Sequence, residues 1–114
     1  MLIRIALALA CFALAACDRE LATGSLDGAE IFRARCATCH GDRGQPPEAM
    51  VARLGVKDLT ARELRAKITP ELVGAQVRHG SQNKLMPSFA GALTEEQIDA
   101  VAAYVASPGF VAAR

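Results

Sequence analysis

The clearest hydrophobic pattern in the chain lies near its C-terminal end. Four apolar residues recur there at helical spacing: Ile98, Val101, Ala102 and Val105. Thr94 precedes this stripe and Gln97 lies three residues after Thr94, an arrangement typical of a capping box at a helix N-terminus. Pro108 and Gly109 follow the stripe, and both interrupt helices. The pattern therefore predicts an amphipathic helix that starts at Thr94 and stops at Pro108.

A second amphipathic helix is predicted over residues 27–36. Asp27 can cap this helix, and Glu30 lies three residues further on, as in a capping box. Ile31 and Phe32 are its predicted inward residues. The helix is expected to end near Cys36.

A short helix is predicted over residues 48–54, with Gly55 closing it. Its predicted inward residues are Met50, Val51 and Leu54. A further helix is expected to begin at Thr60, because Glu63 again lies three residues after a possible cap.

The segment from Thr69 to His79 carries the most complete set of helix signals between the two longer helices. Thr69 can cap, Pro70 occupies the first helical position, and Gly80 can end the helix. No segment alternates with a period of two for long enough to predict a sheet. The expected class is therefore all-α, with about four to five helices.

The first residues differ from the rest of the chain. Arg4 is followed by an uninterrupted run of apolar or small residues over 5–16, too short to cross a bilayer but long enough for a signal-peptide core. The run ends in Leu14-Ala-Ala-Cys17, which resembles a bacterial lipobox. The expected modification is lipidation of Cys17; an ordinary secretory signal is the alternative.

These signals divide the chain into four parts. Residues 1–16 are predicted to be a lipoprotein signal peptide and residues 17–26 a lipid-anchored tether, rich in small and polar residues. The folded domain is expected over residues 27–108, followed by a C-terminal tail over residues 109–114. The mature protein would lie on the periplasmic face of the cytoplasmic membrane or, without the lipid, in the periplasm.

Charge argues against one class of partner. Removal of the leader would take Arg4 alone among the charged residues, leaving twelve basic and twelve acidic side chains. A nucleic-acid-binding protein would be strongly basic, so this class is not expected. Residues 53–84 nevertheless hold seven basic residues against three acidic ones. This segment is either an ordinary solvated surface or a basic rim that attracts an acidic redox partner.

The chemistry of the chain is indicated by Cys36-Ala-Thr-Cys39-His40. Two cysteines at this spacing followed directly by a histidine are typical of covalent haem c attachment. Cys36 and Cys39 would form thioether bonds to one porphyrin, and His40 would bind the iron. The histidine makes the motif specific, because the alternatives require the thiols alone.

Three other uses of the paired cysteines remain open. They can form a disulfide, a thioredoxin-type redox pair, or half of a zinc site. A thioredoxin-type pair belongs in a βαβ unit, yet no strand signal follows Cys39. A zinc site needs two further ligands, and only His79 is left to help.

The second axial iron ligand is predicted to be Met86. It lies in the segment 80–91, which is mostly polar, and Pro87 would stiffen the backbone beside it. A methionine in such a loop is harder to explain as a core filler than one on a helix. Met50 and His79 are the other possible ligands, although a place in the core and on the surface, respectively, is expected for them.

Three groups of residues resemble monohaem class I cytochromes c. They are Cys36-Ala-Thr-Cys39-His40-Gly41, Met86-Pro87-Ser-Phe89, and Leu93-Thr94-Glu-Glu-Gln-Ile98 with Tyr104. The resemblance covers roughly residues 27–106. It implies the cytochrome c fold, in which the helices wrap around one covalent haem c and the N- and C-terminal helices cross near-perpendicularly. Gly28 and Phe32 match the family pattern on the first helix of that crossing, and Tyr104 matches the aromatic residue on the last.

One feature departs from the family pattern. The proline that usually supports the haem after the attachment site has no unique counterpart, which affects the partner of the far nitrogen of His40. A backbone carbonyl near Pro46 or Pro47 is the expected acceptor for that nitrogen.

The resemblance implies a single-electron carrier with protein redox partners, not an enzyme. With both axial positions filled, the iron has no open site for a substrate. Two alternatives stay open: a haem c subunit of a dehydrogenase or oxidase complex, and a ligand sensor in which a small molecule displaces Met86.

Overall fold

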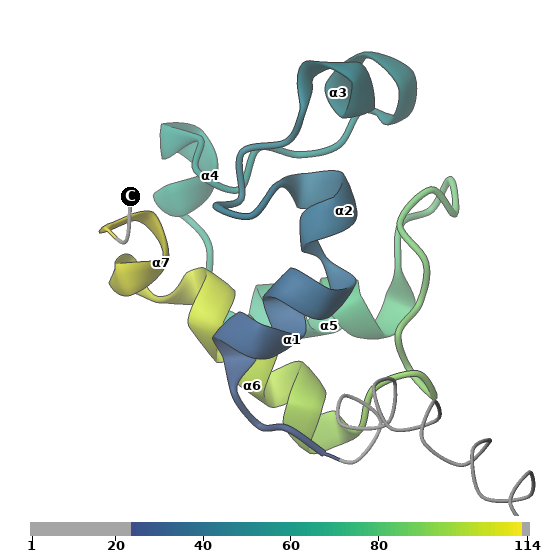
Figure 1. The fold of residues 1–114 in the computed structure, drawn as a ribbon, viewed down its shortest axis with the longest axis vertical. Helices are drawn as coiled ribbons and strands as arrows, with labels where there is room; N and C mark the ends of the chain where they lie inside the picture. Colours follow the sequence, from purple (N-terminus) through teal and green to yellow (C-terminus); the bar gives the residue numbers. More distant parts are fainter. Residues whose placement is uncertain (1–23, 113–114) are drawn as a thin grey trace, which may run out of the picture.

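The structure, a computed structural model, describes residues 24–112 (Figure 1). Within that range it has seven helices and no strand, only an isolated bridge between Ala90 and Leu93. The helices are α1 (Gly28–Arg35), α2 (Ala37–His40), α3 (Glu48–Leu54), α4 (Arg62–Arg65), α5 (Pro70–His79), α6 (Glu95–Ala106) and α7 (Pro108–Ala112). The all-α prediction is confirmed. The count exceeds the expected four to five because short pieces such as α2 and α7 form separate helices.

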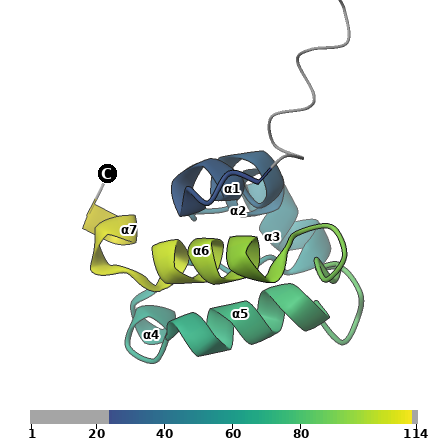
Figure 2. The same cartoon turned by 90° about the horizontal axis from the view of Figure 1, so that it is seen from below.

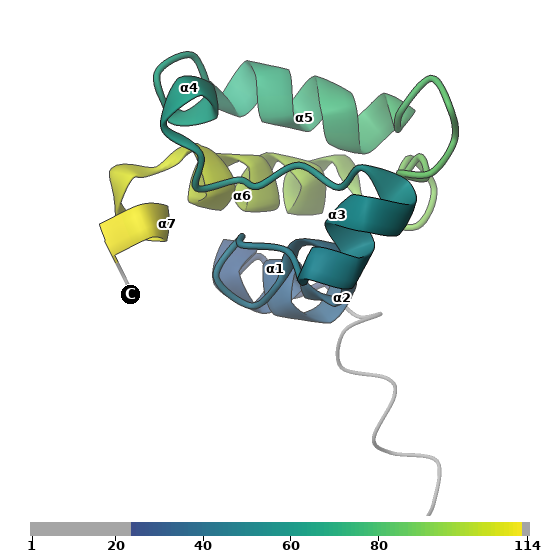
Figure 3. The same ribbon diagram turned by 90° about the horizontal axis from the view of Figure 1, so that it is seen from above.

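Helix α6 is the centre of the fold. Figures 2 and 3 show it between α1 on one side and α5 on the other, and both neighbours pack against it. The buried apolar residues come mostly from these three helices and from α7: Ile31, Phe32, Val77, Ile98, Val101, Ala102, Val105 and Phe110. The stripe predicted on the last helix is therefore the core of the protein.

Helix α1 lies across α6 at a contact with almost no free space. A Cβ atom on Gly28 would approach Tyr104 Cβ to 2.6 Å and would also clash with the Ala100 carbonyl oxygen. The ring of Phe32 meets the ring of Tyr104 edge-on, with centroids 5.9 Å apart. The expected pairing of Gly28 and Phe32 with Tyr104 is confirmed.

Side-chain caps fix the starts of the three longest helices. The Asp27 carboxylate accepts from the Ala29 N–H at 2.9 Å, and the Thr69 hydroxyl accepts from the Leu72 N–H at 3.2 Å. Thr94 and Gln97 form the predicted reciprocal capping box. Each of these contacts spans no more than three residues, so the local sequence was sufficient to predict it.

The cap predicted at Thr60 is wrong. Its hydroxyl donates to the Asp58 carboxylate at 2.6 Å, and its N–H donates to the same oxygen at 2.8 Å. Helix α4 instead starts after Ala61, without a side-chain cap. Asp58 closes a local turn and so occupies the hydroxyl that the helix would have used.

Helix α7 was not expected. Pro108 ends the run of α6, as predicted, but it also begins a new helical turn that includes residues 109–112 of the expected tail. Phe110 on α7 is buried against Phe32 and Tyr104, with ring centroids 5.2 Å from each. Over the residues that the structure describes, no helix has the length and apolarity needed to cross a bilayer.

Candidate haem site

The two cysteines and the histidine of the motif lie on one helical turn. Cys36 ends α1 and begins α2, so its carbonyl oxygen accepts from the N–H groups of both Cys39 and His40, at 3.2 and 2.9 Å. Both cysteines are free thiols. Ala37 is buried, which fixes α2 against the core. The turn therefore presents two thiols and one imidazole from a single rigid segment.

The Cys36 thiol lacks the lowered pKa of a reactive cysteine. Burial, with the neighbouring Cys39 as a smaller cause, raises the pKa of the Cys36 thiol to about 11. Reactive thioredoxin-type cysteines have a lowered pKa instead. Among residues 24–112, no three His, Cys, Asp or Glu side chains gather in a way that could hold a metal ion. The thioredoxin and zinc alternatives therefore find no support in the described part of the chain.

One ring nitrogen of His40 has a partner. Nδ1 lies 3.1 Å from the carbonyl oxygen of Lys57. With its proton on Nδ1, the ring donates to this carbonyl, and Nε2 keeps its lone pair for a metal. Burial lowers the pKa of His40, while the Lys57 carbonyl opposes that shift, so the neutral form is favoured at neutral pH. A neutral, oriented imidazole is what iron ligation requires.

The carbonyl expected near Pro46 or Pro47 is not the partner of His40. The Leu59 N–H donates to the Gly44 carbonyl at 2.8 Å and thereby draws the segment around Lys57 against the attachment loop. The acceptor is therefore seventeen residues from His40 in sequence. A backbone carbonyl has no signature in a sequence, so the pattern of residues could not have indicated Lys57.

Met86 lies in the loop after α5 and is half-buried against the core cluster. Its carbonyl accepts from the Ser81 N–H at 2.9 Å, and its N–H donates to the Ser81 hydroxyl at 3.0 Å. The Phe89 N–H donates to the Val77 carbonyl at 2.9 Å and fastens the far end of the loop to α5. Gly80 begins the loop with φ +70°, where a Cβ would lie 2.5 Å from the Met86 carbonyl oxygen.

The loop that carries Met86 lies at the same end of the molecule as the attachment turn. Figures 2 and 3 show α2, α3 and this loop at the end of the molecule where α6 starts, whereas α7 lies at the other end. The other two possible ligands have different surroundings. Met50 is half-buried on α3, and His79 is exposed at the end of α5.

Helices α3 and α4 make few contacts with the rest of the fold. Neither buries a residue, and neither packs extensively on another helix. Met50 and Leu54 on α3 and Leu64 on α4 are apolar side chains that are only half-buried. Val51, expected inward, is instead 46% exposed. A large, flat, apolar group held by the nearby thiols would give these residues a packing partner, so the residues present fit a haem.

Not all basic residues of the segment 53–84 are available to a redox partner. The Arg78 guanidinium is paired with Glu95 at 2.7 Å and with Asp99 at 2.9 Å. The Arg65 guanidinium is turned inward and donates to three backbone carbonyls. Two of the seven basic residues therefore hold the fold together and are not available to attract a partner.

Comparisons with known proteins agree on one family. Residues 25–105 match the family model described as cytochrome C oxidase, cbb3-type, subunit III. Cytochrome c6 of Nostoc sp. is 39% identical over 101 residues, which cover 89% of this chain and 86% of that protein. Cytochrome c6 of Thermosynechococcus vestitus is 39% identical over 85 residues, 75% of this chain and 70% of its own. The solved structure of the KustC0563 c-type cytochrome superposes with a TM-score of 0.64 at 31% identity, covering 74% of this chain and 96% of its own.

Proposed function

The chain belongs to the monohaem class I cytochromes c and is an electron carrier with one covalently bound haem c, and we propose that His40 and Met86 bind its iron. In this proposal, Cys36 and Cys39 form the two thioether bonds. The contact between His40 Nδ1 and the Lys57 carbonyl supports this proposal most directly. With Nδ1 bonded to that carbonyl, the lone pair of Nε2 stays available for the iron. The bound haem supplies one-electron redox chemistry, and the protein holds and tunes it.

The geometry of the Met86 loop supports the second ligand. The Met86 backbone is hydrogen-bonded on both sides, and Pro87 follows directly. A thioether on iron raises the reduction potential and stabilises the ferrous form. A fixed pair of axial ligands leaves no open position for a substrate, which suits electron transfer without bond making.

The ligand assignment is tested by Met86→Ala, with Met50→Ala as the matched control. We expect Met86→Ala to abolish the near-infrared band of sulfur ligation in the ferric protein, to lower the reduction potential and to let carbon monoxide bind the ferrous iron. Met50→Ala should retain the band. An unchanged spectrum in Met86→Ala would contradict the assignment. Ready binding of carbon monoxide by the unaltered ferrous protein would favour the ligand-sensor alternative.

A second function is favoured by the description of the matching family, which names a subunit of a cbb3-type oxidase. A fixed haem c subunit would pass electrons within a complex instead of diffusing between partners. Purification from gently solubilised membranes of the native host separates the two possibilities. A free carrier elutes alone, whereas a subunit elutes with a larger haem-containing assembly.

The redox partner is proposed to present an acidic surface. Four basic side chains of the segment 53–84 are exposed and make no ion pair in the described structure: Arg53, Lys57, Lys67 and Lys84. Lys57 is also the residue whose backbone carbonyl contacts His40, so this basic residue belongs to the segment beside the haem site. Electron transfer to such a partner should slow as salt is added. A rate that rises with salt would contradict this choice.

Export and lipid anchoring are proposed from the leader alone. Residues 1–16 and Cys17 lie outside the residues that the structure describes. Lipidation of Cys17 would hold the domain of residues 27–108 at the periplasmic face of the cytoplasmic membrane. In the native host, Cys17→Ser should move the protein from the membrane fraction to the soluble fraction. Membrane association that persists in this variant would rule out the anchor.

A further inference from the structure

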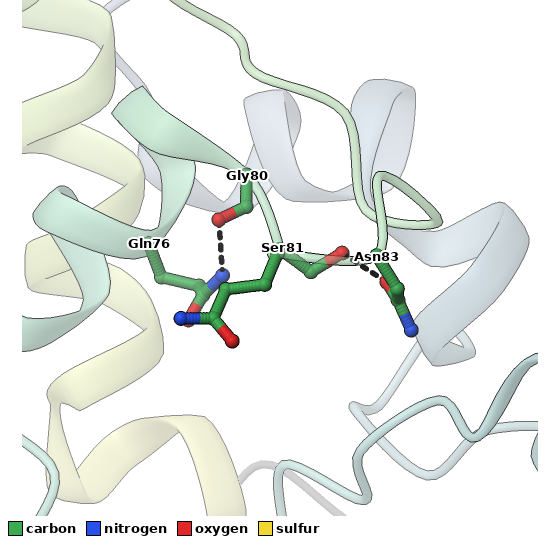
Figure 4. Close-up of a pocket in the computed structure, with 5 residues that line it drawn as sticks. Gln76, Gly80, Ser81 and Asn83 are labelled. Carbon is green, nitrogen blue, oxygen red and sulfur yellow. Dashed lines mark hydrogen bonds between the residues drawn. The ribbon is translucent and has the colours of Figure 1, made fainter.

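The hydroxyl of Ser81 sits at the centre of the hydrogen bonds in the Met86 loop. It accepts from the Met86 N–H at 3.0 Å. It also donates to the Asn83 side-chain oxygen at 2.6 Å, a bond that Figure 4 shows. The Ser81 N–H donates to the Met86 carbonyl at 2.9 Å. One residue therefore bonds both polar backbone groups of the proposed ligand.

Asn83 sets the direction of that hydroxyl. Its side-chain oxygen also accepts from the Leu85 N–H at 3.1 Å, so the oxygen is fixed by the loop itself. A hydroxyl that donates to a fixed acceptor has its lone pairs directed elsewhere, here toward the Met86 N–H. The loop start is fixed as well, because the Gln76 side chain donates to the Gly80 carbonyl at 2.8 Å (Figure 4).

The rest of the loop gives Met86 little support on this side. Residues 82–85 are all exposed, and Leu85 directly before the methionine is 50% exposed. On the other side, the nearest bond to α5 is made by the Ser88 hydroxyl, which donates to the Arg78 carbonyl. The Met86 backbone itself is thus held by its two hydrogen bonds to Ser81.

We propose that Ser81 is a positioning residue that holds Met86 on the iron and so determines how readily that axial position opens to other ligands. The proposal rests on the proposed function, in which Met86 is an iron ligand. An external ligand binds only to molecules in which Met86 has left the iron. The apparent affinity of that ligand is therefore proportional to the fraction of molecules in which Met86 is off the iron. Loss of a hydrogen bond that holds Met86 on the iron increases this fraction and so raises the apparent affinity.

The test measures imidazole binding to the ferric holoprotein of Ser81→Ala, Ser81→Thr and Ser107→Ala. Ser81→Ala should bind imidazole about tenfold more tightly than the unaltered protein, the effect of losing one net hydrogen bond from the closed state. Ser81→Thr keeps the hydroxyl and should remain close to the unaltered protein. Ser107→Ala is the matched control, because its hydroxyl also bonds a backbone group, donating to the Tyr104 carbonyl at 2.7 Å at the far end of α6.

Asn83→Ala supplies an independent variant. It removes the acceptor that orients the Ser81 hydroxyl without touching Met86, so it should also tighten imidazole binding, by less than Ser81→Ala. This variant keeps the proposal testable if Ser81→Ala yields too little holoprotein to measure.

Two results would overturn the proposal. The first is equal imidazole affinity in Ser81→Ala and the unaltered protein, and the second is an equal gain in Ser107→Ala, which would indicate general loosening of the fold. The near-infrared band of sulfur ligation separates this failure from that of the proposed function. If the unaltered protein lacks the band, both fail; if the band is present while Ser81→Ala behaves normally, only the role of Ser81 is lost.

Discussion

Gly28 decides how closely the first and last long helices approach. The backbone of α6 and the Tyr104 side chain occupy the space in which any other residue would place its Cβ. A small residue at this point lets α1 lie directly on α6, and the contact between Phe32 and Tyr104 depends on that approach. The attachment turn follows α1 immediately, so the same contact fixes where Cys36 is presented.

Replacement of Gly28 by alanine should therefore push the two helices apart. We expect Gly28→Ala to lower the free energy of unfolding of the holoprotein by about 1–3 kcal/mol, the usual cost of overpacking. Gly109→Ala is the control, because a Cβ there meets only the Ser107 hydroxyl oxygen at an ordinary 3.9 Å. Urea denaturation followed by circular dichroism measures both, and equal stability of the two variants would contradict the close-contact account.

At the scale of elements, α7 packs against the loop that follows His40. The Phe110 ring fills the space over Gly44, where a Cβ would lie 2.5 Å from it. The Arg65 guanidinium lies over the same ring, 5.4 Å from its centroid. It also donates to the Val105 carbonyl at 2.7 Å and to the Ser107 carbonyl at 2.9 Å. Helices α4, α6 and α7 are joined through this one side chain.

Removal of the Arg65 side chain should lower the free energy of unfolding more than removal of the Arg62 side chain, which is also on α4. We expect Arg65→Ala to lower the free energy of unfolding by about 2–3 kcal/mol, because charged hydrogen bonds to carbonyls are lost together with the stacking on Phe110. Arg62→Ala should change it by less than about 0.5 kcal/mol, since the Arg62 side chain is 95% exposed and its pairing with Glu63 is long, at 4.0 Å. Similar losses in both variants would mean that the inward contacts of Arg65 do not stabilise the fold.

The sequence predicted those elements whose signals are local. Asp27, Thr69 and Thr94 cap helices through bonds that span two or three residues, and all three were identified. Thr60 was misassigned because Asp58, only two residues away, competes for its hydroxyl. The helical turn around Phe110 was missed because its stability comes from rings on α1 and α6, which no pattern within residues 108–112 could indicate.

In the candidate site, too, some residues could be predicted from the sequence and others could not. The thiols, the imidazole and the methionine were singled out because their side chains carry the chemistry and their order along the chain is distinctive. Lys57 was not found because it acts through its carbonyl, and Ser81 was not singled out because a serine in a polar loop has no distinctive pattern. Backbone acceptors and loop hydroxyls become visible only when distant segments have been brought together.

At the scale of the whole molecule, the described fold has one part with a buried core and another part with few buried residues. Helices α1, α5 and α6 share the buried core, whereas α3 and α4 bury no residue of their own. Short helices that make few packing contacts are only marginally stable in water. A domain of this size buries only a modest fraction of its surface, so the rest of the fold adds little stability to these two helices.

The haem-free chain should therefore lose much of its helical structure. We expect circular dichroism of protein produced without haem maturation to show far less helix than the holoprotein, with the loss including α3 and α4. The holoprotein of identical sequence is the reference. Native helicity in the haem-free chain would show that the polypeptide folds without the cofactor and that the haem only occupies a preformed site.

The most direct test of the account is the mass of one peptide. Trypsin cleaves after Arg35 and Arg43, so it releases residues 36–43 with both thiols and His40 in a single fragment. In protein matured in a host that attaches haem c, this fragment should carry the mass of one haem, and neither thiol should react with an alkylating reagent. The unmodified mass, with both Cys36 and Cys39 open to alkylation, would contradict the assignment of these residues as the attachment site.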